Sequence, residues 1–244
     1  MKKINLSNYT DFIVEETTKL LNIDSPTGYT EEAAAWVKAE FEKLGFDARL
    51  TNKGGVIVDL TGEEKDNGLL LEAHTDTLGG MVATIKDNGR LQLTNLGGMN
   101  PNNAETENVR VVTKFDGIYE GTFQLNNASI HVNGDYDDTK RTWENCEVVL
   151  DEDVKSKEDA EKLGISVGDF VCFEPNVRVT KTGYIKSRFL DDKLSVGILL
   201  ALPSILKRRR LLQRELSTDT SRYLKRLDTA EAAAFRKDVQ KQYQ

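Results

Sequence analysis

The N-terminal part of the chain repeats apolar positions with the period of an α-helix. Residues 8–23 and residues 31–46 each show an apolar stripe at helical spacing, and the turn-rich segment SPTGY separates them. Thr30 is placed to cap the second helix, and Gly45 is placed to end it. The pattern therefore predicts two amphipathic helices.

Runs typical of strands follow the two helices. They occupy residues 47–52, 55–60 and 68–74. The last run, GLLLEAH, is apolar enough to predict a buried, central strand, with His74 at its carboxyl end. Helices followed by such strands predict an α/β layer fold, in which functional sites gather at the carboxyl ends of strands.

From about residue 80 the pattern changes to that of β-structure. Residues 81–93 and 109–125 are hairpin candidates with turns at Asp87–Gly89 and near Gly117. Other strand-like runs lie at 146–150, 169–173 and 177–186, with one short helix, SKEDAEKLG, that Ser156 would cap. Helical spacing returns at 187–206. We expect an α/β domain formed by 1–79 and 177–202, with an all-β domain, 80–176, inserted into it.

The last part of the chain has a different composition. Residues 203–244 contain 11 of the 33 Lys and Arg residues but only 5 of the 40 Asp and Glu residues, and none of the 18 glycines. This tail contains no run typical of a strand, and AEAAAFRKDVQKQY has good helix propensity. The sequence leaves open whether this tail forms a helix or is disordered. We hypothesise an out-of-frame read or a truncated gene beginning near residue 203.

Composition and charge narrow the function classes. The formal net charge of −7 argues against general binding to nucleic acid or to anionic membranes. The basic run KRRR at 207–210 is more typical of a solvated face than of a nucleic-acid site. No apolar stretch is long enough to span a bilayer, and MKKINLSNYTDF lacks the apolar core of a signal peptide. Cys146 and Cys172 form no CxxC motif, so we expect reduced thiols and a cytoplasmic protein.

Two short motifs are candidates for a metal site. On a strand, His74 and Asp76 share a face, and a carboxylate beside an imidazole can orient it for metal binding. Asp191 and Asp192 precede an apolar helix, where one carboxylate could bridge two ions. Each motif has a plainer alternative. A histidine at a strand end is often structural, and an aspartate before a helix is often its N-cap.

The ordered set of segments resembles a family. An SPTGY turn between helices, HTDTLGGMV after a strand, the text VVLDEDVKSKEDAEKLGISVGDFVCFEP and then RFLDDKLSVG occur in this order. Over about residues 5–202 the chain resembles the tetrahedral (TET-type) metallo-aminopeptidases, also called glutamyl or deblocking aminopeptidases and sometimes labelled endoglucanases. The adjacent carboxylates of Asp191 and Asp192 cannot flank a glycosidic bond, which argues against the last label.

The resemblance implies roles for particular residues. It makes His74 the terminal ligand of one of two zinc or cobalt ions, and Asp76 a catalytic residue that holds the His74 ring. Asp191 would bridge the two ions, and a cis peptide would join it to its neighbour Asp192. Two such ions would activate a water for hydrolysis of N-terminal residues from short peptides. The inserted β domain would mediate homo-oligomer assembly.

The resemblance also implies an adjacent Glu-Glu pair after the next strand and a final histidine ligand near the C-terminus. Neither is present in this sequence. The Glu-Glu pairs lie at 15–16, 31–32 and 63–64, all before His74, and the only other histidine, His131, lies in the predicted insert. A zinc site needs three or four protein ligands, so two predict weak metal binding and an inactive chain. A non-catalytic assembly subunit and a truncated remnant stay open as alternatives.

One acidic segment is a weaker metal candidate. GDYDDTKRTWEN places Asp135, Asp137 and Asp138 close together, as calcium loops do. It lacks the central glycine and the final glutamate of such loops, so we expect an exposed turn.

Overall fold

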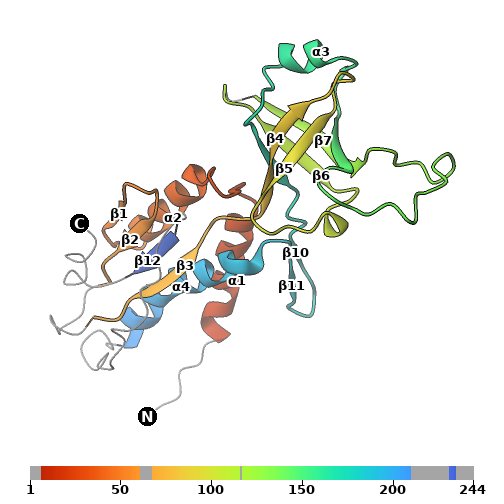
Figure 1. Cartoon of the computed structure of the whole chain (residues 1–244). Helices are drawn as coiled ribbons and strands as arrows, with labels where there is room; N and C mark the ends of the chain where they lie inside the picture. Colours follow the sequence, from red (N-terminus) through yellow and green to blue (C-terminus); the bar gives the residue numbers. More distant parts are fainter. Residues whose placement is uncertain (1–6, 61–67, 116, 210–230, 235–244) are drawn as a thin grey trace. The chain divides into compact units, whose positions relative to one another are not determined.

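The structure, a computed structural model, describes residues 7–60, 68–115, 117–209 and 231–234. The chain divides into two compact units, Met1–Asp76 with Pro175–Gln244, and Thr77–Glu174. The first unit mixes helices and strands, and the second is a closed antiparallel barrel (Figure 1). A mixed α/β fold with a separate all-β part is therefore confirmed.

The described part of the first unit has three helices: α1 (Ser7–Leu21), α2 (Glu31–Lys43) and α4 (Leu190–Arg209). Thr30 is the N-cap residue of α2, but its side chain makes no capping bond, so that part of the prediction was wrong. Gly45 follows the last turn with φ +82°, and its N–H donates to the Glu42 carbonyl at 2.9 Å. The left-handed backbone at Gly45 ends α2 as expected.

Over the residues that the structure describes, the sheet of the first unit has four strands in the order β1-β2-β12-β3 (Figure 1). Their bounds are β1 Ala48–Leu50, β2 Val56–Val58, β3 Leu71–His74 and β12 Glu231–Ala234. β12 runs parallel to β2 and antiparallel to β3.

Two predictions about these strands were wrong. β3 lies at an edge of the described sheet, and Ala73 is its only fully buried residue, so β3 is not a buried central strand. Residues 231–234 of the tail form a strand, where helix propensity favoured a helix and no strand was expected. Backbone pairing with two neighbours outweighs the poor β-propensity of Glu-Ala-Ala-Ala. The rest of the predicted helix, 235–243, lies outside the described residues.

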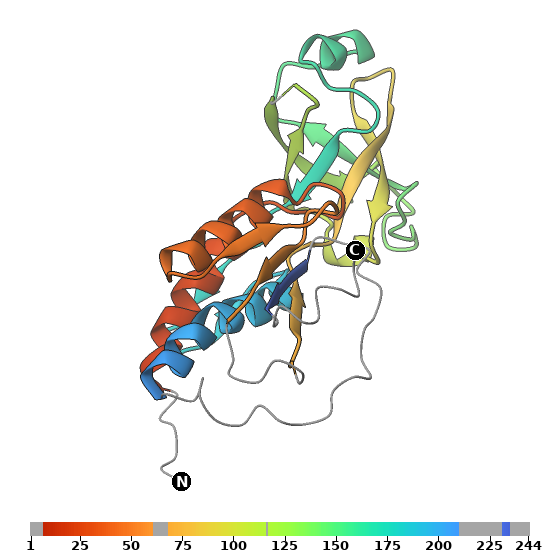
Figure 2. The ribbon, with the colours of Figure 1, turned by 90° about the vertical axis from the view of Figure 1, so that its left-hand side faces the viewer.

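The helices and the sheet of the first unit enclose one hydrophobic core. α4 packs along α1 (Figure 2) and against β3, while α2 packs on β1 and β2. Periodic apolar positions of α1, α2 and α4 meet the buried strand residues there, as the helical pattern predicts. The buried members are Leu20, Ala33, Ala34, Val37, Phe41, Ala48, Val56, Val58, Ala73, Val196, Leu199 and Leu200.

The second unit closes six strands into a barrel in the order β4-β5-β8-β7-β6-β9. Both predicted hairpins are present, as β4–β5 and β6–β7. The strand bounds are β4 Gly79–Ile85, β5 Leu91–Leu96, β6 Asn108–Val112, β7 Ile118–Leu125, β8 Cys146–Leu150 and β9 Phe170–Phe173. Closure leaves no open sheet edge on these strands.

Short elements complete the description. A 3-10 turn spans Pro101–Asn103, and α3 (Lys157–Lys162) begins after Ser156, whose hydroxyl accepts the Asp159 N–H at 3.2 Å as predicted. In the first unit, β10 (Arg178–Val179) and β11 (Ile185–Lys186) form a small hairpin before α4. Among the described helices, none has the length and apolar character needed to cross a membrane.

Candidate active site

His74 is held at the end of β3 by the residue two places further along the chain. Its Nδ1 lies 3.1 Å from Oδ1 of Asp76 and 3.2 Å from the Asp76 carbonyl oxygen. Both neighbours are hydrogen-bond acceptors, so they favour the imidazole tautomer with its proton on Nδ1. The lone pair of Nε2 is then directed away from Asp76.

The Asp76 carboxylate is itself fixed. Its side chain is only 13% exposed, and its second oxygen, Oδ2, accepts the hydroxyl of Thr27 at 2.7 Å. One oxygen therefore faces the imidazole and the other faces Thr27. This arrangement can orient a histidine ligand, because a hydrogen-bonded carboxylate fixes both ring position and tautomer.

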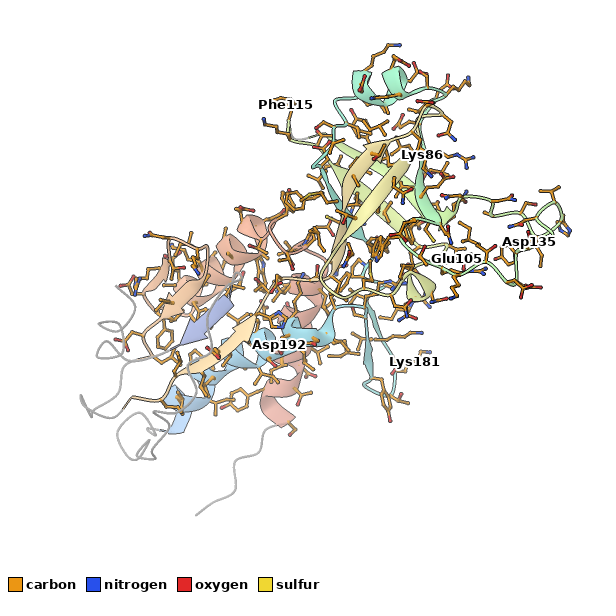
Figure 3. The ribbon with its side chains drawn as sticks, in the orientation of Figure 1. Lys86, Glu105, Phe115, Asp135, Lys181 and Asp192 are labelled. Atoms are coloured by element: carbon orange, nitrogen blue, oxygen red, sulfur yellow. The ribbon has the colours of Figure 1, made fainter. Side chains whose placement is uncertain are left out.

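Asp191 lies on the other side of the His74 ring. Oδ1 of Asp191 is 3.4 Å from Nε2 of His74, and the Asp191 side chain is 97% exposed. The peptide between Asp191 and Asp192 is cis, and both residues have non-helical backbone angles, so regular helix begins only after them. Figure 3 shows Asp192 at this start of α4. The cis peptide that the family resemblance implied is present.

The His74–Asp191 contact has a chemical consequence. With the proton on Nδ1, a lone pair on Nε2 faces a negative carboxylate, and a bound cation, a second proton on the ring or a bridging water would relieve the repulsion. Two ligands of one tetrahedral zinc ion, with bonds of about 2.0–2.1 Å, lie about 3.3 Å apart. The observed separation of 3.4 Å suits such an ion in donor type and in distance.

The described residues do not complete a metal site. Within them, no group of three or more His, Cys, Asp or Glu side chains is placed to hold an ion. Of the two glutamates in the tail, Glu215 lies outside the described residues, and Glu231 stands opposite His74 in the β12–β3 backbone register. Within the described residues, His74 and Asp191 are therefore a pair of possible ligands and not a full set.

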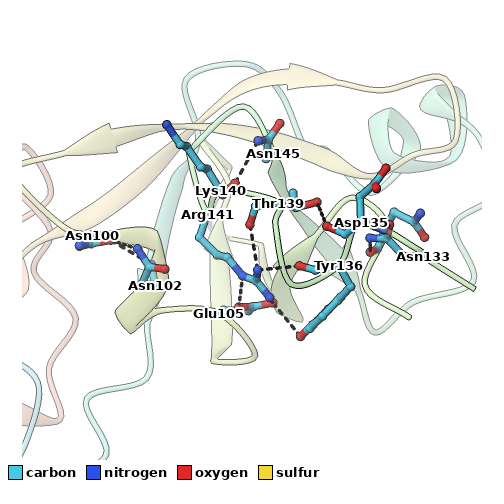
Figure 4. Close-up of polar contacts among 11 residues, drawn as sticks. Asn100, Asn102, Glu105, Asn133, Asp135, Tyr136, Thr139, Lys140, Arg141 and Asn145 are labelled. Carbon is cyan, nitrogen blue, oxygen red and sulfur yellow. Dashed lines mark hydrogen bonds and ion pairs between the residues drawn. The ribbon is translucent and has the colours of Figure 1, made fainter. Parts of the chain in front are cut away.

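The other candidates from the sequence lie elsewhere. His131, Asp135, Asp137 and Asp138 belong to the loop between β7 and β8 of the second unit, and His131 is exposed. Figure 4 shows that polar contacts of Arg141 fold this loop back on itself. The exposed turn expected for these residues is present.

Sequence reasoning missed three residues that support the site. Thr27 bonds Asp76, Ser25 donates its hydroxyl to the Thr75 carbonyl at 2.7 Å, and the buried Lys193 binds the end of α1. The segment SPTGY was interpreted only as a turn. Two hydroxyl residues in a turn that must meet a strand end were the available signal.

Comparisons with known proteins agree with this fold. The family model for M42 glutamyl aminopeptidases matches residues 54–217, which extends the resemblance past residue 202. "Putative aminopeptidase YhfE" of Bacillus subtilis (strain 168) is 41% identical over 189 residues, which are 78% of this chain and 55% of that protein.

Solved structures show the same fold. An aminopeptidase from the archaeon Desulfurococcus kamchatkensis superposes with a TM-score of 0.70 at 21% identity, over 93% of this chain and 56% of its own. The TET1 peptidase of Pyrococcus horikoshii gives 0.68 at 23% identity, over 92% and 60%.

The matched sequence and the mixed α/β unit with its barrel define the class of protein as that of the M42 peptidases. The chain belongs to the M42 glutamyl aminopeptidase family. It spans 55% of the length of the Bacillus subtilis relative and 56% of the Desulfurococcus kamchatkensis structure.

Proposed function

We propose that this chain takes part in removing N-terminal residues from short peptides, at an active site that binds two divalent ions, zinc or cobalt. His74 and Asp191 are its ligands, Asp76 orients His74, and Asp192 supports Asp191 from the adjoining peptide. The observation that supports this most directly is the 3.4 Å approach of His74 Nε2 to Asp191 Oδ1. Within the described residues, the proposal assigns two ligands and one orienting carboxylate, and it assigns no residue to a later step.

The two histidines of the chain provide a matched test. The metal-free protein is titrated with Zn²⁺ and with Co²⁺ by calorimetry, and hydrolysis of aminoacyl p-nitroanilides is followed at each metal level. His74→Ala and Asp191→Asn are expected to lose metal binding, because each removes a ligand. His131→Asn is the control, since His131 is exposed in the barrel unit.

Metal binding that survives His74→Ala, or that falls equally in His131→Asn, contradicts the proposed ligands. Metal binding without any hydrolysis would leave the ligand assignment standing but reject catalysis by this chain alone.

A non-catalytic assembly subunit is the second candidate. The barrel closes completely, whereas the described residues supply only two ligands. The TET1 peptidase of Pyrococcus horikoshii can assemble into a tetrahedron or a large octahedral shell. We propose homo-oligomer formation through the barrel. Light scattering of the purified chain tests this: an oligomer without hydrolysis favours the subunit, and a monomer rejects it.

A further inference from the structure

A short segment after α1 touches both elements that hold the candidate ligands. We define the 23–27 segment as Ile23 to Thr27, sequence IDSPT. Its contacts reach the end of β3, which positions His74, and the first turn of α4, which positions Asp191. These contacts are direct hydrogen bonds within the first unit.

Two hydroxyls connect the segment to the end of β3. The Ser25 hydroxyl, which is buried, donates to the Thr75 carbonyl at 2.7 Å, between His74 and Asp76 in the chain. The Thr27 hydroxyl donates to Asp76 Oδ2 at 2.7 Å, leaving Oδ1 to face His74. The segment thereby fixes both the backbone and the carboxylate that orient the imidazole.

A buried ammonium connects the segment to α4. Lys193 is 1% exposed, and its Nζ donates to the Leu20 carbonyl at 3.1 Å and to the Ile23 carbonyl at 2.6 Å. These carbonyls lie at the C-terminal end of α1, where helices leave acceptors without intrahelical partners and where positive charge is favoured. Burying an ammonium is costly without such partners, which makes this position of Lys193 specific.

These contacts connect His74 to Asp191 through a continuous series of residues. The series runs from His74 through Asp76 and Thr27 to Ile23. From Ile23 it continues to Lys193, which lies two residues after Asp191. We infer that the 23–27 segment sets the separation of His74 from Asp191, with Thr27 and Lys193 as its positioning residues. The inference rests on the proposed function only in that His74 and Asp191 are the proposed ligand pair.

The two positioning residues act on different ends of the pair. Thr27 acts on the imidazole, because a hydroxyl on Oδ2 keeps the Asp76 carboxylate turned so that Oδ1 meets Nδ1. Lys193 acts on the carboxylate, because it anchors the backbone two residues after Asp191. Loss of the Thr27 hydroxyl should change the His74 tautomer. Loss of the Lys193 ammonium should change only the position of the Asp191 carboxylate that faces Nε2.

The test uses nitrogen NMR of the imidazole in the metal-free full chain. His131→Asn leaves His74 as the only histidine. At about pH 8, where an ordinary imidazole is neutral, long-range proton–nitrogen spectra distinguish the two tautomers. In this background we compare Thr27→Val, Thr27→Ser, Lys193→Met and Asp191→Asn. Val37→Ala, a truncation in the core of α2, serves as a control for lost stability.

We expect Thr27→Val to reduce the Nδ1-protonated tautomer and Thr27→Ser to restore it. Lys193→Met should keep that tautomer, and it should change the chemical shift of Nε2 in the same way as Asp191→Asn does. Spectra unchanged in Thr27→Val and Lys193→Met, or changed equally in Val37→Ala, overturn the inference.

A Cd²⁺ titration of the same variants separates this inference from the proposed function. Supporting residues around metal ligands are worth about 10–100-fold in metal affinity. We expect losses of that size in Thr27→Val and Lys193→Met, and wild-type affinity in Thr27→Ser. If the unmutated chain binds no metal, the proposed function fails while the tautomer results still decide the inference.

Discussion

Gly197 of α4 lies directly against Thr17 of α1. A Cβ atom built on Gly197 would be 2.1 Å from Oγ1 of Thr17 and 3.4 Å from the carbonyl oxygen of Ile13. The two helices therefore approach as closely as they do because position 197 has no side chain. This contact lies in the helix whose first turn contains Asp191.

Gly197→Ala is expected to destabilise the protein by about 1–3 kcal/mol, because the added methyl group overlaps a fully buried side chain. Urea unfolding measures this loss. Adding Thr17→Ala removes the overlapping hydroxyl and should recover most of the stability. Gly98→Ala is the control, since a Cβ there meets nothing within 4 Å. Equal stability of the Gly197→Ala and Gly98→Ala proteins would contradict the close packing.

Glu147 is a buried carboxylate of the barrel that two cations share. Its side chain is 3% exposed, Lys86 Nζ donates to Oε2 at 2.7 Å, and Arg90 donates to Oε1. Glu147→Gln removes the buried charge and weakens two charge-assisted hydrogen bonds, so we expect the free energy of unfolding to fall by about 2 kcal/mol. Thermal unfolding at low and high salt measures it. A loss below about 1 kcal/mol would mean that solvent screens the pair as it does at surfaces.

The sequence was sufficient for the local elements, and its short motifs indicated residues that lie close together in the structure. Apolar periodicity predicted α1 and α2, turn glycines predicted the barrel hairpins, and the His-x-Asp and Asp-Asp motifs gave the residues that meet at the candidate site. It could not predict the place of β3 in the sheet, because sheet order depends on partners distant in sequence. The role of Thr27 was also hidden, since one hydroxyl in a turn has many uses.

Burial raises the pKa of the Cys146 thiol to about 11, with the nearby Glu105 carboxylate adding to the effect. The thiolate is the reactive form, so Cys146 should react slowly with Ellman's reagent at about pH 8 while the protein is folded. A raised folded pKa contributes stability below the ordinary thiol pKa of about 8.5 and loses it as pH rises to about 11. Cys146→Val should flatten that alkaline decline. A fast reaction at pH 8 in the native protein would contradict this burial.

The carboxylate of Asp159 makes the stability of α3 depend on pH in the acidic range. The hydrogen bond from Lys162, then those from Ser156 and the Lys155 N–H, lower the pKa of Asp159 to about 2. A lowered folded pKa contributes stability above the ordinary value of about 3.9, and that contribution is lost as pH falls to about 2. In Asp159→Asn, the part of the acid dependence that falls in this window should disappear. Ser156→Ala, which removes the cap, should cost about 1 kcal/mol near neutral pH. An unchanged acid profile in Asp159→Asn would contradict these bonds.

Arg141 closes the loop between β7 and β8 (Figure 4). Its Nε donates to Glu105 Oε2 at 2.7 Å, its NH1 donates to the carbonyls of Tyr136 and Thr139, and its guanidinium stacks 4.7 Å from the Tyr136 ring centroid. A lysine cannot reproduce this planar set of donors, so Arg141→Lys should free the loop.

Limited trypsin digestion measures that release, because Lys140 supplies a cleavage site in every variant. We expect Arg141→Lys to be cut in the loop at least several-fold faster than the wild type. Arg110→Lys, which alters the Arg110–Glu174 pair on the barrel, is the matched control and should be cut at the wild-type rate. Equal rates in all three proteins would show that the loop holds its conformation without Arg141. A faster cut in both variants would trace the effect to the barrel as a whole.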